Sequence, residues 1–99
     1  MNQLKVRAKV VEKAPLRYTP AGIPVASALL MHQSQQIEAK AGRLVEFEIQ
    51  ALAAGEISSR FDSLAMDVDV EFTGFLARKN RNSKSLVFHV TDFEINLLD

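Results

Sequence analysis

The sequence predicts an all-β fold in which five strands form a barrel and one short helix lies between the third and fourth strands. Two observations carry this prediction. Apolar and polar residues alternate with the period of a strand in most of the apolar segments, and one segment instead has its apolar residues at helical spacing. The chain has 99 residues, which is enough for one domain and too few for two. We therefore expect a single domain over residues 1–99.

The first three predicted strands lie in the N-terminal half of the chain. Residues 4–10 alternate apolar with basic side chains, which indicates a strand with one face in water. Residues 25–33 are mostly apolar on both faces, and the glycine and proline that precede them favour a strand over a helix. Residues 45–50 alternate again, and the polar face of this strand is mostly acidic.

One helix and two more strands are predicted in the C-terminal half. Ile57, Phe61 and Leu64 have the spacing that places three apolar side chains on one face of a helix of about three turns. Residues 68–74 then alternate as a fourth strand that ends near its glycine. Residues 86–95 form a fifth strand that becomes irregular toward its end.

Three connecting segments lack a strand pattern. Residues 13–24 contain all three prolines, which predicts a long and stiff loop because proline cannot donate into a β-ladder. Residues 35–42 are polar and loop-like, and residues 78–84 are a polar, basic hairpin loop.

The phenylalanines supply much of the predicted core. Phe47, Phe72 and Phe88 lie on the apolar phases of their strands, and Phe61 lies on the inward face of the helix. We therefore expect all four to pack inside the fold rather than to offer exposed rings.

This order of elements is that of an OB-fold, a five-stranded Greek-key barrel. In an OB-fold, the loops between strands 1 and 2 and between strands 4 and 5 flank the binding face. Here these two loops contain the clearest clusters of basic residues, although the net charge of the chain is zero. The fold and the charge distribution together favour a nucleic-acid ligand.

Four cations are clustered in the second of these loops. The asparagines and serine among them can hydrogen-bond phosphate oxygens, so the loop is suited to follow a phosphate backbone. About four contacts with a single strand would give a salt slope of roughly −0.7 for each contact. A solvated hairpin tip is the alternative interpretation. The four cations are Arg78, Lys79, Arg81 and Lys84.

Further candidates lie elsewhere in the chain. Arg17, Tyr18 and Arg43 would assist binding, and Tyr18 is the aromatic residue that we expect to be exposed for base stacking. A role in anchoring the loop is the alternative for Tyr18.

The three basic residues of the first strand also have two interpretations. Lys5, Arg7 and Lys9 either contact phosphate or form cross-strand ion pairs with Asp69 and Glu71 of the fourth strand. Ion pairs of this kind would remove basic charge from the binding face.

The sequence offers no catalytic or metal-binding motif. It has no cysteine and no glycine-rich phosphate loop, and its two histidines, His32 and His89, lie on separate predicted strands. We expect no enzyme, no cofactor and no metal, and a small metal-dependent hydrolase is only the third alternative. No segment has the roughly 18–20 apolar residues of a membrane span and the N-terminus lacks a signal-peptide core, so we expect a soluble, cytoplasmic protein.

Three segments resemble a known family. The loop after the first strand closely resembles that of bacterial single-stranded-DNA-binding proteins and of a shorter group of relatives, the primosomal replication protein N family. The chain stops at Asp99 without the glycine-rich linker and acidic tip of the longer proteins, so it looks like the shorter group. The matching positions are Pro15, Arg17, Thr19, Gly22 and Pro24 in the loop, Leu64, Val70, Phe72, Gly74 and Leu76 around the fourth strand, and His89 and Ile95 in the last strand.

The resemblance implies a homodimeric accessory protein of the replication restart primosome that binds single-stranded DNA. Such a protein would assist the restart helicase and help recruit the next loading factor, and single-stranded-DNA-binding protein is a further candidate partner. The resemblance also implies a dimer interface at the first strand. DNA would contact the face of strands 2 and 3 and the loop where Lys79, Arg81 and Lys84 match the family.

The chain departs from the family pattern at three positions. Glu46 stands where relatives can present a stacking tryptophan, Gln33 where they can have a basic residue, and Asp67 where glycine often turns the chain. Glu46 and the nearby Glu48 would repel phosphate if they faced the groove. The rival interpretation is therefore an OB-fold protein-interaction module of the replication machinery with little intrinsic DNA affinity.

Overall fold

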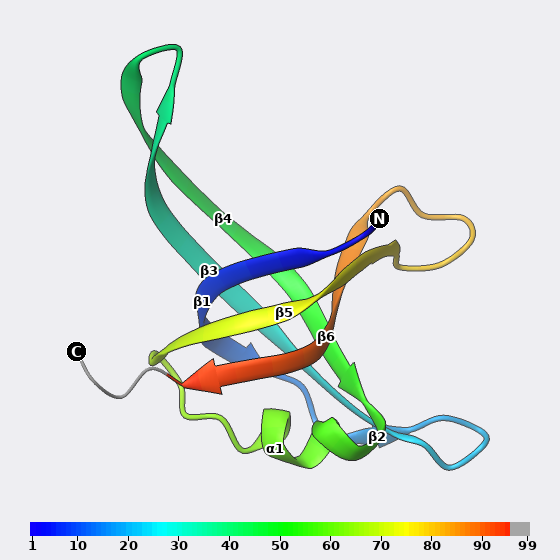
Figure 1. The fold of residues 1–99 in the computed structure, drawn as a ribbon. Helices are drawn as coiled ribbons and strands as arrows, with labels where there is room; N and C mark the ends of the chain where they lie inside the picture. The colour runs from blue at the N-terminus through cyan, green and yellow to red at the C-terminus, as the bar shows by residue number, and fades with distance from the viewer. Residues whose placement is uncertain (96–99) are drawn as a thin grey trace.

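The computed structural model describes residues 1–95, which form a closed five-stranded barrel with one short helical segment (Figure 1). The strand order is β1-β5-β6-β4-β3, and a pairing between β1 and β3 closes the barrel. A short strand, β2, is added beside β3. This topology confirms the predicted OB-fold. The elements are β1 (Leu4–Lys13), β2 (Arg17–Tyr18), β3 (Pro24–Glu38), β4 (Ala41–Ala54), η1 (Gly55–Ile57), α1 (Ser58–Asp62), β5 (Asp69–Arg78) and β6 (Leu86–Ile95).

Strand β1 closes the barrel because it pairs with two neighbours along different parts of its length. Leu4 to Lys9 pair with β5, and the residues from Lys9 onward pair with β3. The register with β3 shifts between Val10 and Glu12, and such an irregularity bends a strand from one neighbour to the next. Within the described part of the chain, residues 4–8 therefore have a strand partner on one edge only.

Phenylalanine side chains fill much of the barrel. Phe61, Phe72, Phe88 and Phe93 are almost completely buried. The ring centroids of Phe61, Phe72 and Phe93 lie 6.0, 6.2 and 6.4 Å apart, with tilted or edge-on planes. Burial of one such side chain stabilises the fold by roughly 1.5–3 kcal/mol. The core assignments of Phe61, Phe72 and Phe88 are confirmed.

Phe47 is not in the core, which corrects the sequence prediction. Its side chain is 37% exposed, and its ring packs on His32 with the two centroids 4.8 Å apart. Phe47 lies on the apolar phase of β4, but at this position β3 and β4 extend past the rest of the barrel. Among residues 1–95, no opposite sheet covers the ring there, so alternation alone could not reveal its exposure.

The predicted loop at residues 35–42 is instead the end of a long hairpin. Strands β3 and β4 pair without interruption along nearly their whole length. Ala39 and Lys40 form the turn with φ angles of 52° and 65°, a two-residue geometry that matches the twist of a hairpin and usually uses asparagine and glycine. Ala39 and Lys40 are not residues that usually mark such a turn, so the sequence indicated a loop here but not a two-residue turn. Figure 1 shows the outer part of the hairpin, residues 33–46 and hereafter the arm, projecting away from the barrel.

The helical segment is shorter than predicted. It consists of one 3₁₀ turn, η1, followed by the five residues of α1, and it ends before Leu64. The Ser63 hydroxyl donates to the Ser59 carbonyl at 2.9 Å, and serine bonds of this kind compete with helix continuation. Leu64 is nevertheless buried, as its place in the apolar spacing predicted.

Strand β5 begins after a turn at Asp67 and extends farther than predicted. Asp67 has a φ of 61°, a left-handed conformation that aspartate adopts more readily than most residues. The strand then runs past Gly74 as far as Arg78, so the predicted end near Gly74 was wrong. Gly74 lies where the register between β5 and β6 shifts, and the pairing resumes on its far side.

Candidate nucleic-acid interface

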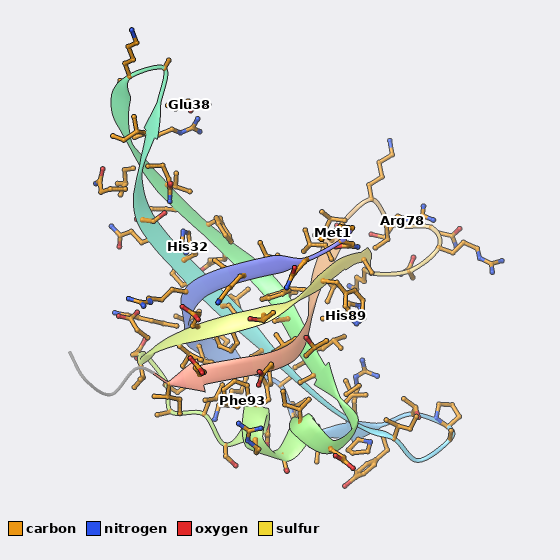
Figure 2. All side chains as sticks on the ribbon, viewed as in Figure 1. Met1, His32, Glu38, Arg78, His89 and Phe93 are labelled. Atoms are coloured by element: carbon orange, nitrogen blue, oxygen red, sulfur yellow. The ribbon has the colours of Figure 1, made fainter. Side chains whose placement is uncertain are left out.

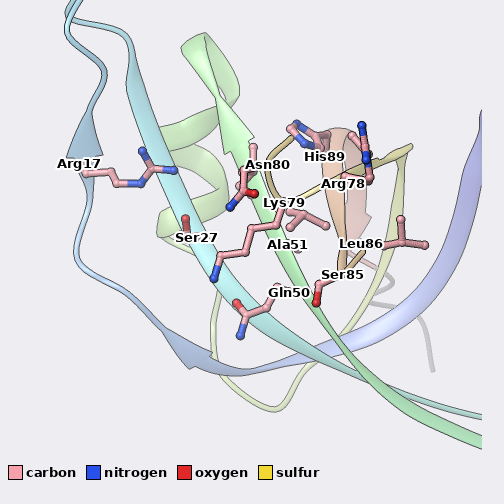
Figure 3. A pocket seen from close by; sticks show the side chains of 13 residues that line it. Arg17, Ser27, Gln50, Ala51, Arg78, Lys79, Asn80, Ser85, Leu86 and His89 are labelled. Carbon is pink, nitrogen blue, oxygen red and sulfur yellow. The ribbon is translucent and has the colours of Figure 1, made fainter. Parts of the chain in front are cut away.

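A groove of about 740 Å³ lies between β2 and β3 on one side and the β5–β6 connection on the other (Figure 3). We refer to the connection, residues 79–85, as the basic loop. The floor of the groove is apolar and includes Ala51 and Leu52 of β4 and Val87 of β6. Its polar side chains include Arg17, Ser27, Gln50, Arg78, Lys79 and Asn80.

Three of the predicted cations lie together at this groove. Arg17 comes from β2, Arg78 from the end of β5 and Lys79 from the start of the basic loop, and all three are exposed. Within residues 1–95, the ion pairs are Lys5 with Glu71 and Arg43 with Glu38, so none of them neutralises a groove cation. The groove therefore has a local positive charge although the chain as a whole is neutral.

The basic loop is ordered by its own hydrogen bonds. The Lys79 N–H donates to the Ser85 carbonyl at 2.9 Å, and the Ser83 N–H donates to the Asn80 carbonyl at 3.2 Å. The Asn82 N–H donates to Oδ1 of Asn80 at 2.9 Å. These bonds use backbone atoms and the Asn80 side chain, so none of them occupies a cationic side chain.

Arg81 and Lys84 share this loop but do not line the groove. Both residues are exposed near its tip, and Figure 2 shows that the loop beyond Arg78 projects away from the barrel. A strand in the groove would meet Arg78 and Lys79 first and would reach Arg81 and Lys84 only by following the loop outward.

Tyr18 lies next to Arg17 on β2, at the margin of the groove rather than in it. Its side chain is 64% exposed, and its strand partner is Pro24 of β3. The short strand β2 was not predicted, because its two residues lie in a segment rich in proline. An exposed ring held by backbone pairing is compatible with base stacking.

Arg43 is separated from the other candidates. It lies on the arm, where its guanidinium Nη1 donates to Oε1 of Glu38 at 2.6 Å. Figures 1 and 2 show the arm and the basic loop on opposite sides of the molecule. The structure therefore does not bring Arg43 to the groove.

Of the three cations of the first strand, the structure shows a cross-strand ion pair for Lys5 but not for Arg7 or Lys9. Lys5 lies 3.4 Å from a carboxylate oxygen of Glu71, so this cation forms a cross-strand ion pair. Arg7 and Lys9 are in register with Glu71 and Asp69, but neither forms an ion pair within the described residues.

Sequence reasoning missed several polar residues of the groove and one aromatic pair. Ser27, Gln50 and His89 line the groove, and His89 stacks on Phe75 with ring planes only 8° apart and centroids 4.8 Å apart. Gln50 lies on the polar phase of its strand, so periodicity could have suggested that it was exposed. The pairing of Phe75 with His89 depends on the β5–β6 register, which no local pattern reveals.

The described residues offer no metal cluster and no membrane helix. No group of three or more histidine, aspartate and glutamate side chains in residues 1–95 is arranged to hold a metal ion. In the same range, no helix is long and apolar enough to cross a bilayer.

The closed barrel and its cationic groove define the class of protein, a small OB-fold protein of the single-strand-binding type. Residues 2–92 match the model of a family described as another single-strand binding protein family. A small single-stranded DNA-binding protein from Streptomyces coelicolor has the same fold, with a TM-score of 0.72 at 16% identity, over 98% of this chain and 96% of that one.

More similar relatives narrow this class. The replication restart protein PriB of Nitrosomonas europaea is 42% identical over 94 residues, which cover 95% of this chain and 87% of that protein. PriB of Bordetella pertussis is 34% identical over 90 residues, or 91% of this chain and 84% of that protein. The solved structure of PriB from Ralstonia solanacearum has a TM-score of 0.89 at 43% identity and covers 97% of this chain and 98% of that one. The chain therefore belongs to the single-strand binding protein family and, within it, to the PriB replication restart proteins.

Proposed function

We propose that this protein binds single-stranded DNA during replication restart and that the strand lies along the groove and the basic loop. Arg17, Arg78 and Lys79 contact phosphates in the groove, and Arg81 and Lys84 contact phosphates farther along the loop. Tyr18, which follows Arg17 on β2, offers its ring to a base at the margin of the groove that lies across from the basic loop. Arg43 contributes only to a strand that reaches the arm and displaces its ion pair with Glu38.

One observation carries this proposal. Cations from two separate segments, residue 17 and residues 78–79, converge on a single groove of the OB barrel, and no ion pair within residues 1–95 neutralises them. In a structural role, buried or paired charges would be expected instead. Exposed and unpaired cations are suited to a polyanion, because phosphate contacts release the counterions that surround the nucleic acid.

Fluorescence anisotropy with labelled dT oligonucleotides tests this proposal. We expect saturable binding that grows with oligonucleotide length, because a longer strand reaches more of the basic loop. With four or five phosphate contacts at roughly −0.7 each, a doubling of the salt concentration should weaken binding by about eightfold. Binding that is insensitive to both length and salt would contradict the proposal.

A protein-interaction module is the second candidate function. Glu46 and Glu48 are both exposed on β4, and an acidic surface repels phosphate while attracting a basic protein partner. In this case the restart helicase, the next loading factor or single-stranded-DNA-binding protein would be the ligand. The same anisotropy experiment separates the two candidates, since an interaction module gives no saturable signal with dT. In both cases we place the protein in the cytoplasm, where replication forks restart.

We also propose that the protein is a homodimer and that β1 of one copy pairs with β1 of the other. Residues 4–8 pair with β5 on one edge and have no second strand partner within the described chain. An unpaired strand edge presents backbone groups that can template a further strand. The Arg7 carbonyl lies 2.6 Å from Nδ1 of His32 on β3, so it faces the edge away from β5 and is already contacted there by a side chain.

The orientation of Arg7 gives a specific test of the dimer. In an extended strand the N–H and the carbonyl of one residue point to the same side, so the Arg7 N–H also faces the open edge. Arg7→Pro removes this donor without removing a hydrogen bond to β5, whereas Arg7→Ala keeps it. By sedimentation, we expect the wild type and Arg7→Ala at twice the 11.0 kDa chain mass and Arg7→Pro at the monomer mass. A dimeric Arg7→Pro protein would place the interface elsewhere.

A further inference from the structure

The polar side chains of the groove are rich in hydrogen-bond donors. Arg17, Arg78 and Lys79 carry donors and no acceptor. The carboxamide of Asn80 has its oxygen turned toward the Asn82 N–H at 2.9 Å, so its NH₂ group is the end that remains for a ligand. When phosphates are bound to the three cations, a base in the groove can still contact this NH₂ group.

The groove also lacks the usual means of sequence-tolerant binding. Within the described residues, no phenylalanine, tyrosine or tryptophan lines it, and the His89 ring that does line it is stacked on Phe75, which covers one of its faces. Single-strand binders without base preference depend on stacking, because every base offers a flat face. In this groove, recognition of a base therefore depends more on hydrogen bonds to its edge.

DNA bases differ in what they offer to a donor-rich surface. Thymine and guanine carry a keto oxygen, which accepts hydrogen bonds, at the position where cytosine and adenine carry an NH₂ group. An NH₂ group placed against the Asn80 NH₂ group leaves two donors without partners. Donors that lose water without gaining an acceptor weaken binding.

We infer that the groove selects keto bases over amino bases in single-stranded DNA. The inference rests on the proposed function, since it requires DNA in the groove. In the view of Figure 3, the Lys79 side chain extends between Asn80 and Gln50 toward Ser27. The Asn80 NH₂ group binds the keto oxygen of a base in the groove.

Three homopolymers of equal length test this selectivity. Oligonucleotides of dT, dU and dC are all pyrimidines, so their stacking and flexibility are similar, and a mildly alkaline buffer keeps dC neutral. We expect dT and dU to bind equally and dC to bind about fivefold more weakly. Equal binding of all three oligonucleotides would overturn the inference. Binding of dU as weak as that of dC would also overturn it, because the groove would then recognise the methyl group of thymine and not the keto oxygen. If none of the three oligonucleotides binds, the proposed function is overturned instead.

A pair of variants assigns the selectivity to Asn80. Asn80→Asp keeps the oxygen that holds the Asn82 N–H and replaces the free donor with an acceptor. Asn82→Asp makes the same change of charge in the same loop, at a residue that does not line the groove. Both variants should lower affinity, but we expect only Asn80→Asp to bring the ratio of dT to dC affinity to about one or below. A ratio that stays at the wild-type value in Asn80→Asp, or that falls equally in Asn82→Asp, would refute the assignment.

Discussion

Replacement of Lys79, Arg81 and Lys84 by alanine is expected to reduce the magnitude of the salt slope of dT binding by about 2 and to weaken binding by roughly 100-fold at about 0.1 M salt. Each lost phosphate contact removes the release of about 0.7 counterion from a single strand, so three contacts account for the change. The three residues are exposed on the basic loop, which is held by its own backbone hydrogen bonds, so the fold should not change. Anisotropy titrations at several salt concentrations measure both quantities.

A second triple variant controls for net charge. Lys13, Lys40 and Arg60 are exposed cations that lie outside the groove and the basic loop, and their replacement by alanine removes the same three charges. We expect this variant to retain most of the affinity and nearly all of the salt slope. If the two variants lose equal affinity, the DNA responds only to overall charge and the assignment of the loop fails. An unchanged slope in the loop variant would refute it directly.

Gly74→Ala is expected to destabilise the fold strongly, because the added methyl group has no space. A Cβ atom at Gly74 would collide with the carbonyl oxygen of His89 on β6 and would lie 2.9 Å from a ring carbon of the buried Phe88. Backbone cannot move aside as a flexible side chain does, so β5 and β6 must separate at the bulge. We expect a loss of about 3 kcal/mol and a fall in Tm on the order of 15 °C in a domain of this size. Thermal unfolding followed by circular dichroism measures this change.

Gly42→Ala is the matched control for Gly74→Ala. Gly42 also lies in a strand, but a Cβ atom there would meet no atom within 4 Å. We expect its free energy of unfolding to stay within about 0.5 kcal/mol of the wild type. Equal stability of the two variants would show that the β5–β6 bulge is more open than its geometry indicates.

Local patterns were sufficient for the strands and much of the core. Alternation predicted the strands that became β1, β4, β5 and β6, the glycine and proline before residue 25 favoured the strand that became β3, and the apolar spacing around Phe61 identified its inward face. These features follow from the period of the backbone, which is present in the sequence itself. The same patterns misplaced Phe47. Alternation shows on which face of the strand a side chain lies, but it does not show whether another sheet covers that face.

The basic loop was recognised from composition, whereas the groove was not. Arg17 and Lys79 are far apart along the chain, and the barrel topology places them on opposite margins of one depression. Arg43 had the same chemistry as the other candidates in the sequence, yet the long hairpin carries it away to the arm, where it pairs with Glu38.

The amino-acid sequence by itself determined the OB barrel, its position in a family and the loop that concentrates positive charge. Only the tertiary structure decided which cations share a groove, which two form ion pairs and which amides line the groove. The physical reason is that charge and period are properties of short segments. Convergence of side chains depends instead on strand register and on the curvature of the closed sheet, which arise from contacts between residues distant in the chain.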